Sequence, residues 1–238
     1  MNQQLSKALF QKKTLKNALV NFKFPSDLEA RHKIIKKWIE ALNSGTLNQE
    51  KEVALHGDFL KDIFQDVLGY SSIIAGGGKL WEINAEQTIA NGRGYADAAL
   101  GLFTATENNK RKVQDKVVAP IELKGTKDDL DRPAPGRKES AVEQGWRYAN
   151  YTPDCHWIII SNYRELRLYH TNKTPAYYEK FLLVDLADLE EFKRFYFLLC
   201  RETFLPVKDV SKIDTLLVTS EEAQEDITKK LYEEYKQV

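Results

Sequence analysis

Two stretches of the sequence decide the fold: GYADAALGLF (residues 94–103) and VVAPIELKG (residues 117–125). Both alternate in a way that predicts β-strands, because successive side chains of a strand point to opposite faces. In the second stretch Glu122 and Lys124 share one face, and the other face is apolar, with Val117, Ala119, Ile121 and Leu123. In the first stretch Asp97 shares a face with Ala99 and Gly101, which are small and leave space above the strand. The alternation therefore predicts a charged face with open space beside it.

Upstream of these strands the sequence predicts an N-terminal helical segment. One helix ends at Pro25, and Ser26 or Asp27 can cap a second helix, which breaks at residues 43–45. A third helix begins near Leu47 and ends at Gly69, before a glycine loop at residues 76–78. Apolar residues recur at helical spacing through these segments: Leu5, Leu9, Leu15, Leu19, Ile34, Ile35, Trp38, Ile39, Leu42, Val53, Phe59, Leu60, Ile63, Phe64, Val67 and Leu68.

Downstream, a polar loop runs from Gly125 through Arg137, and Ser140 with Glu143 forms a capping box for a short helix that ends near Asn150. Residues 157–161 are a compact apolar run, which is typical of a buried strand. Two further strands, an aromatic-rich helix and a charged helix follow at residues 165–170, 178–184, 189–204 and 221–235. This order predicts an α/β core, a mixed central sheet flanked by helices, with the N-terminal helical segment attached.

The composition limits the class of protein. The 238 residues suffice for one domain with its own core. No run approaches the roughly 20 apolar residues of a membrane span, and residues 1–16 lack the apolar core of a signal peptide. Cys155 and Cys200 are expected to be reduced core thiols, so we expect a cytoplasmic protein without a membrane partner. Thirty-five basic residues balance 35 acidic ones, which argues against a globally basic DNA-binding surface and leaves room for a local basic groove.

Asp97, Glu122 and Lys124 form the set of side chains that phosphodiester hydrolysis needs. Two carboxylates hold one or two Mg²⁺ ions, because hard cations prefer oxygen ligands. Such an ion polarises the phosphate and lowers the pKa of a bound water, while a lysine orients that water and offsets transition-state charge. The backbone carbonyl of Leu123 lies between the two charged residues of its strand and can supply another metal ligand. We therefore expect Mg²⁺ as the cofactor, with Mn²⁺ as a substitute.

These residues resemble the motif of the PD-(D/E)XK nuclease superfamily. Asp97 matches the first acid of the motif, and Glu122 with Lys124 matches its E-x-K. Ala96 stands where the motif has a proline, which members of the superfamily often lack. Pro120 is unusual inside a strand, because proline cannot donate to a central ladder, so the strand starts late or Pro120 sits at a bulge. The resemblance implies a restriction-endonuclease-like fold.

Two helices extend the resemblance. The segment EQGWRYA places Gln144 and Tyr148 four residues apart on one helix face, similar to the Q-x-x-x-Y helix of a subset of these nucleases that includes lambda-exonuclease-like ones. The alternative is a polar surface with one packed tyrosine. In related nucleases a helical glutamate joins the metal site, and Glu52 is the candidate here, with Glu50 or a plain exposed carboxylate as the alternatives. His56 lies one turn after Glu52, which gives it a possible role near the site.

Four segments together resemble the N-terminal nuclease domain of type IIG restriction-modification enzymes: ADAALGLF, PIELKGTKDDLDR, VEQGWRYAN and CHWIIISNYRELRLYH. In such enzymes one polypeptide carries nuclease, adenine methyltransferase and DNA-recognition domains. The resemblance implies an N-terminal helical segment at residues 1–46, a nuclease core at 47–205 and a helical connector at 206–238. It also implies a methyltransferase and a target-recognition domain in the same chain or in a partner chain.

The loop after the E-x-K strand carries candidate DNA contacts. Lys127, Arg132, Arg137 and Lys138 can meet phosphates, although three aspartates dilute the local charge, and Tyr148 is a further candidate. Other signals fail as sites. AGGGKL lacks the upstream glycine and the Ser/Thr of a phosphate-binding loop, and the four histidines show no zinc spacing.

The sequence thus predicts a Mg²⁺-dependent endonuclease domain acting on double-stranded DNA. Asp97 and Glu122 bind the metal, Lys124 assists the water and the phosphate, and Gln144 orients the site. Sequence specificity comes from another domain, and two copies assemble on DNA for double-strand cleavage. Two alternatives stay open. One is a repair or recombination nuclease, an exonuclease or junction nuclease, that attacks ends or branched DNA. The other is a non-catalytic module that keeps the fold as a DNA or protein docking domain.

Overall fold

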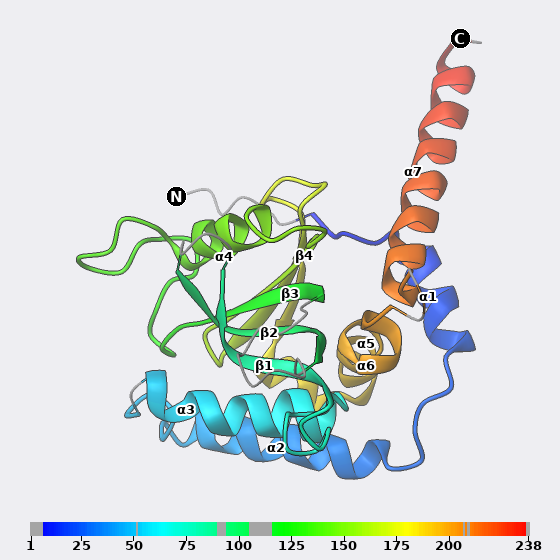
Figure 1. Ribbon diagram of the computed structural model, residues 1–238. Helices are drawn as coiled ribbons and strands as arrows, with labels where there is room; N and C mark the ends of the chain where they lie inside the picture. The colour runs from blue at the N-terminus through cyan, green and yellow to red at the C-terminus, as the bar shows by residue number, and fades with distance from the viewer. Residues whose placement is uncertain are drawn as a thin grey trace.

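A mixed six-stranded sheet forms the centre of the molecule (Figure 1). The computed structural model describes residues 7–50, 52–89, 94–104, 116–206, 208 and 210–236, without the side chain of Glu234. The strands lie in chain order: β1 (Leu80–Thr88), β2 (Tyr95–Thr104), β3 (Lys116–Leu123), β4 (Trp157–Ser161), β5 (Glu165–His170) and β6 (Glu179–Leu182). Neighbouring strands are antiparallel except β3 and β4, which are parallel. With helices on both faces, this architecture confirms the predicted restriction-endonuclease-like fold class.

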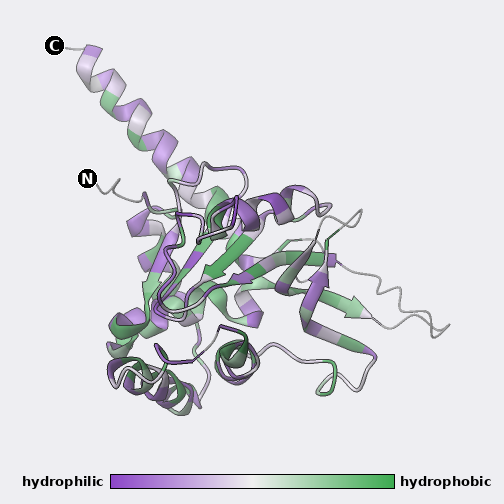
Figure 2. Ribbon diagram, turned by 90° about the vertical axis from the view of Figure 1, so that its left-hand side faces the viewer, coloured by the Kyte–Doolittle hydropathy of each residue, from purple (hydrophilic) through white to green (hydrophobic). Residues whose placement is uncertain are grey.

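Helices cover the two faces of the sheet unequally. One face carries α4 (Ala141–Asn150), and the opposite face carries α2 (Leu28–Asn43), α3 (Glu52–Phe59) and the π-helix η1 (Leu60–Val67) (Figure 1). The remaining helices are α1 (Lys12–Asn21), the 3₁₀-helix η3 (Leu183–Ala187), α5 (Leu189–Leu199), α6 (Arg201–Phe204) and α7 (Lys212–Lys236). The larger apolar cluster joins these helices to β-strand residues such as Ile121 and Ile159. The hydropathy colouring of Figure 2 shows the central strands as strongly hydrophobic, while the projecting part of α7 is mixed.

The connection from β3 to β4 contains α4, because two parallel strands require a crossover between them. Ser140 caps this helix as predicted: its hydroxyl accepts from the Glu143 amide at 3.2 Å, and the Glu143 carboxylate accepts from the Ser140 amide at 2.8 Å. Gly145 lets the helix approach the sheet closely, since a Cβ there would lie 2.8 Å from a methyl carbon of Ile158. The helix is thereby fixed next to the strand that carries Glu122.

The irregular position of Pro120 is accommodated at the start of the parallel ladder. Pro120 lies opposite Ala99 of β2, while the pairs between β3 and β4 begin at Ile121. The β2–β3 register shifts between the pairs Leu100–Ala119 and Gly101–Val117, so the bulge lies near Pro120 and not at it, and β3 does not start late. The shift also corrects one expectation. Val117 packs in the cluster under α4 and not with Ala119, Ile121 and Leu123 on the other face.

Several element boundaries differ from those expected. Strand β1 was not predicted; its polar residues include Glu82, whose carboxylate is buried between the Ser71 hydroxyl and the Arg201 guanidinium. The first helix starts at Lys12, because the preceding segment is extended and bridges to Tyr177. Leu5 lies outside the described residues.

Other helix boundaries also differ from those expected. The third helix starts at Glu52 and not near Leu47, and Asp27 stands at the N-cap of α2 without a side-chain cap hydrogen bond. The aromatic-rich helix is interrupted at Cys200, whose backbone is extended. The final helix starts at Lys212, nine residues earlier than expected, because its first turns bury Ile213, Leu216 and Leu217 in the core.

Two further observations concern the cysteines and the length and polarity of the helices. Both cysteines are buried free thiols, as predicted. Among the described residues, no helix is long and apolar enough to cross a lipid bilayer.

Candidate active site

The register of β2 and β3 brings Asp97 beside the E-x-K residues. Ala98 pairs with Ile121 in this antiparallel ladder, so Asp97 comes next to Glu122. An Asp97 carboxylate oxygen, Oδ2, accepts a hydrogen bond from the Leu123 amide at 2.7 Å. The sheet itself therefore positions the first acid of the motif at the carboxyl end of β3.

Glu122 and Lys124 form a buried ion pair on β3. Their exposed fractions are 1% and 8%, and the Lys124 ammonium donates to Glu122 Oε1. The second oxygen, Glu122 Oε2, is buried and has no hydrogen-bond partner among the described residues. Burial raises the pKa of Glu122 to about 8, and the negative charges of Asp97 and Glu52 add to the effect while Lys124 opposes it. The site is thus short of positive charge.

Helix α3 brings two more side chains to the same edge. Glu52 Oε2 accepts from the Gly125 amide at 3.2 Å, and the Tyr163 hydroxyl donates to the Glu52 carbonyl at 3.1 Å. His56 follows one turn later, with Nε2 at 3.9 Å from Glu52 Oε1. One ligand atom each from Glu52, His56 and Asp97 lie within 4.8 Å of one another. The structure therefore places Glu52, the predicted helical glutamate, beside Asp97.

These residues fit a divalent cation. Carboxylate oxygens are the ligands of hard cations, and an imidazole nitrogen suits transition-metal ions. Two buried atoms, Glu122 Oε2 and His56 Nε2, lack a hydrogen-bond partner among the described residues. Such atoms carry a desolvation cost that a bound cation can offset. The Leu123 carbonyl stays a predicted ligand.

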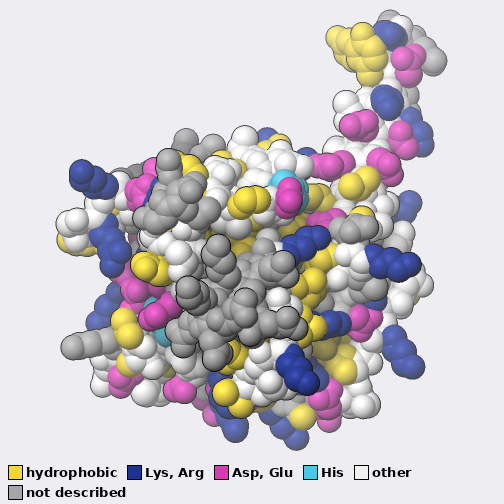
Figure 3. All heavy atoms as spheres, viewed as in Figure 1, with side chains coloured by type: hydrophobic (Ala, Val, Ile, Leu, Met, Phe, Trp, Pro, Cys, Tyr) yellow, Lys and Arg dark blue, Asp and Glu magenta, His cyan; other side chains and the backbone are white. Residues whose placement is uncertain are grey.

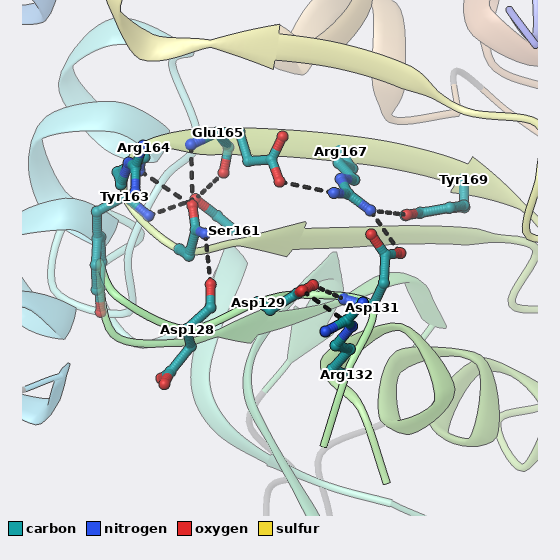
Figure 4. Close-up of polar contacts among 11 residues, drawn as sticks. Asp128, Asp129, Asp131, Arg132, Ser161, Tyr163, Arg164, Glu165, Arg167 and Tyr169 are labelled. Atoms are coloured by element: carbon teal, nitrogen blue, oxygen red, sulfur yellow. Dashed lines mark hydrogen bonds and ion pairs between the residues drawn. The ribbon is translucent and has the colours of Figure 1, made fainter. Parts of the chain in front are cut away.

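The loop after β3 is anchored to the β4–β5 hairpin. Asp128 accepts from the Gly125 amide at 2.9 Å, and the Asn162 side chain donates to the Asp128 carbonyl at 2.9 Å. Farther along, Arg167 of β5, 7% exposed, donates to Asp131 at 2.8 Å (Figure 4). These contacts hold the start of the loop close to the site, which fixes the route of the basic residues that follow.

The basic residues predicted to contact DNA are all exposed on this loop: Lys127, Arg132, Arg137 and Lys138. Tyr148, the further candidate, is instead buried on α4, with 3% of its surface exposed. Arg132 forms an ion pair with Asp129 at 3.6 Å. Arg137 and Lys138 line an open hollow of about 530 Å³ whose wall includes Gln144 and Arg147. In Figure 3, Lys and Arg side chains stand out at the left-hand edge, where Figure 1 shows the loop between β3 and α4. The structure thus separates this pair from Lys127 and Arg132 and places it against α4.

Gln144 and Tyr148 contact each other along α4. The Gln144 amide donates to the Tyr148 hydroxyl at 2.5 Å, and Tyr148 packs with Ile89 and Ala96. Among the described residues, the hydrogen-bond partner of Gln144 is Tyr148 and not Asp97, Glu122 or Lys124. Its expected role in orienting the site stays a prediction, and its observed position is the wall of the basic hollow.

Sequence reasoning left the role of His56 open and did not single out Tyr163. The signal for His56 was present as EVALH, in which a glutamate and a histidine are four residues apart and share a helix face. Tyr163 has a positive φ of 63°, in the tight turn between β4 and β5, and no local pattern links it to Glu52. Burial and the nearby charge of Glu52 raise its pKa, so it stays a hydrogen-bond donor.

Comparison with known proteins gives only weak structural likeness. No family model matches the chain, and no curated protein matches it. A chain of the DrdV–DNA complex solved by cryo-EM is similar with a TM-score of 0.39 and 16% sequence identity, covering 70% of this chain and 96% of that chain. A likeness of this degree assigns neither family nor function, so the residues of the chain itself must support any assignment.

Proposed function

We propose that this chain is a metal-dependent nuclease domain that hydrolyses phosphodiester bonds in DNA. One observation supports the proposal above the others. Asp97, Glu122 and Lys124 meet at one end of β3, and the buried Glu122 carboxylate keeps one oxygen without a partner among the described residues. A structural ion pair alone would not need a second carboxylate and an unpartnered oxygen in a buried position.

The chain's own residues divide the work of hydrolysis. Asp97, Glu122 and Glu52 hold Mg²⁺ or Mn²⁺, with the Leu123 carbonyl as a further ligand. When bound, the ion polarises the scissile phosphate and acidifies a water. Lys124 orients the attacking water and offsets negative charge on the phosphate. The anchoring of Gly125 by Glu52 and Asp128 keeps β3 and its loop in place.

Duplex DNA is the proposed substrate. Arg137 and Lys138 line one hollow with Gln144. They belong to the loop that follows the E-x-K strand, and their positive charges would guide a DNA backbone towards that strand. The wider assignment rests on the sequence resemblance. It places this nuclease in a cytoplasmic type IIG-like restriction-modification system, with a methyltransferase and a target-recognition domain in the same chain or a partner chain. Two copies act together on DNA for double-strand cleavage.

The test is cleavage of supercoiled and linear plasmid DNA with and without Mg²⁺ or Mn²⁺. Asp97→Asn keeps a side chain able to contact the Leu123 amide, and Lys124→Ala removes the ammonium; each is expected to lower the rate by at least about 100-fold. Lys230→Ala, on the exposed part of α7, is the matched control and should cleave at the wild-type rate. Thermal unfolding of each variant checks that the fold is retained.

Four outcomes separate the functions. Cleavage of closed circles supports an endonuclease, and cleavage of linear DNA alone indicates an end-directed nuclease. Wild-type rates in both site variants would refute the catalytic assignment. Metal-independent DNA binding without cleavage would leave a docking module.

A further inference from the structure

His56 is a partly buried imidazole with no evident structural task. Its Nε2 has no hydrogen-bond partner among the described residues, although its side chain is 20% exposed. The nearest acid is Glu52, but the 3.9 Å between Nε2 and Glu52 Oε1 exceeds a hydrogen bond. A histidine that only packed in the core would normally satisfy both ring nitrogens, as buried polar groups do.

The direction of this nitrogen is set by helix geometry. Glu52 and His56 are four residues apart on α3, so both side chains lie on one face of the helix. That face meets Asp97 of β2, and one ligand atom from each residue falls within 4.8 Å of the others. The Tyr163 hydroxyl holds the Glu52 backbone, which fixes the first turn of α3 against the sheet.

A second observation at the same place indicates a cation. Glu122, with its side chain 2% exposed, keeps Oε2 buried without a partner among the described residues. The negative charges of Asp97 and Glu52 act on this carboxylate. Lys124 is the ammonium paired with Glu122, while Glu52 and Asp97 use one oxygen each on backbone amides. The remaining oxygens of these acids and the His56 nitrogen form a donor set of mixed type.

We propose that His56 is a ligand of a metal position formed with Glu52 and Asp97, and that its imidazole makes this centre select Mn²⁺ and similar transition-metal ions over Mg²⁺. Carboxylates and water suit Mg²⁺, which is seldom held by nitrogen, while imidazole binds transition-metal ions well. This inference deepens the proposed function, because Asp97 belongs to both, and it names a ligand and an ion preference that Asp97, Glu122 and Lys124 alone do not give.

The experiment measures ion binding by the whole chain without DNA. Titration calorimetry gives the Kd for Mn²⁺ and for Mg²⁺ in the wild type, in His56→Gln, in Glu52→Gln and in the control His156→Gln. His156 is exposed and its ring contacts Thr171 at 3.3 Å. Electron spin-echo spectroscopy of bound Mn²⁺ then tests for a coordinated ¹⁴N.

The wild type and His156→Gln are expected to bind Mn²⁺ at least about 10-fold more tightly than Mg²⁺, because imidazole favours transition-metal ions. His56→Gln should lose that preference and the ¹⁴N signal while its Mg²⁺ affinity changes little. Glu52→Gln should weaken both ions. An unchanged Mn²⁺ affinity in His56→Gln, or no Mn²⁺ binding by the wild type, would overturn the inference.

Failure of the inference and failure of the proposed function are distinguishable. Mn²⁺ bound with the nitrogen signal, but no DNA cleaved with any ion, would leave the metal position standing and remove the nuclease. Cleavage abolished by Lys124→Ala, with unaltered Mn²⁺ binding in His56→Gln, would leave the nuclease and remove His56 as a ligand.

Discussion

At the scale of single residues, His170 shows how burial ties stability to pH. Its pKa is lowered to about 4, chiefly by burial and then by the charges of His156 and Lys173, against the opposing effect of Asp214 and Glu221. Its Nδ1 accepts from the Asn172 amide at 3.3 Å, and its ring meets Trp157 edge-on. The fold therefore holds this imidazole in its neutral form.

Because the pKa of His170 is lowered in the folded state, the unfolded chain binds a proton first as the pH falls. Its contribution to stability is complete above pH 6.5 and is lost as the pH falls towards 4. We expect the free energy of unfolding to drop by about 2 kcal/mol between pH 7.5 and 4.5 from this residue alone. Urea unfolding of wild type and His170→Gln at both pH values measures it. An identical loss in the variant would contradict the assignment.

Some residues of the candidate site could be predicted from the sequence, and others could not. Asp97, Glu122 and Lys124 could be proposed together because strand alternation fixes which of them share a face. That Glu52 and His56 lie close to Asp97 could not be derived from the sequence, because it depends on how α3 packs against the sheet. His56 precedes Asp97 by 41 residues in the chain, so no local pattern links the two. Local periodicity gives the face of a helix and not its partner.

At the scale of elements, two helical glycines have opposite surroundings. A Cβ at Gly145 of α4 would lie 2.8 Å from Ile158 and 3.1 Å from Ile160, whereas a Cβ at Gly57 of α3 would meet nothing within 4 Å. Close packing of α4 on β4 therefore depends on a missing side chain, and α3 has room to spare at its glycine.

The same substitution should have opposite effects at these positions. Gly145→Ala should lower the free energy of unfolding by about 1–3 kcal/mol, because α4 must move away from the sheet. Gly57→Ala should raise it by about 0.5–1 kcal/mol, because alanine favours the helix. Chemical denaturation of both variants checks the signs. A stabilised Gly145→Ala protein would show that α4 is not closely packed.

Elements also differ in how well their sequences predict them. The capping box of α4 and the apolar run of β4 are local signals, and both elements were predicted. Strand β1 was missed because its polar residues interrupt the alternation of polar and apolar side chains. Glu82 can be buried there because residues distant in the chain, such as Arg201, pair with its carboxylate. The start of α7 was missed although it carries a local signal: the Ser211 hydroxyl accepts from the Asp214 amide at 3.1 Å, and the Asp214 carboxylate accepts from the Ser211 amide at 3.2 Å.

At the scale of the whole molecule, balanced charge makes the proposed DNA affinity depend on a small surface. Lysines and arginines equal acidic residues in number, so a local group must supply the attraction. The hollow lined by Arg137 and Lys138 also contains Glu139, which pairs with Arg147 at 3.0 Å. Because the hollow contains both positively and negatively charged residues, substitutions there can be designed either to weaken or to strengthen DNA binding.

Arg137→Ala and Lys138→Ala should each weaken DNA binding and reduce the slope of log K against log salt by about 1. Glu139→Gln removes a negative charge from the same hollow and should strengthen binding. Fluorescence anisotropy with a labelled duplex over a salt series gives both quantities, with Lys230→Ala as a control that leaves them unchanged. Weaker binding by Glu139→Gln would argue against a phosphate in the hollow.

The π-helix η1 continues the helix that carries Glu52 and His56, and its geometry determines the direction in which these two side chains point. Its backbone pairs residues five apart, as in the bond from the Leu68 amide to the Ile63 carbonyl at 2.9 Å, so it holds more residues per turn than an α-helix. Deleting one residue there, such as exposed Lys61, would turn the preceding helix by roughly 100° relative to its buried stripe. Glu52 and His56, the proposed metal ligands on this helix, would then face away from Asp97 although each was still present. A length change in this segment is therefore expected to abolish metal binding as fully as the loss of a ligand.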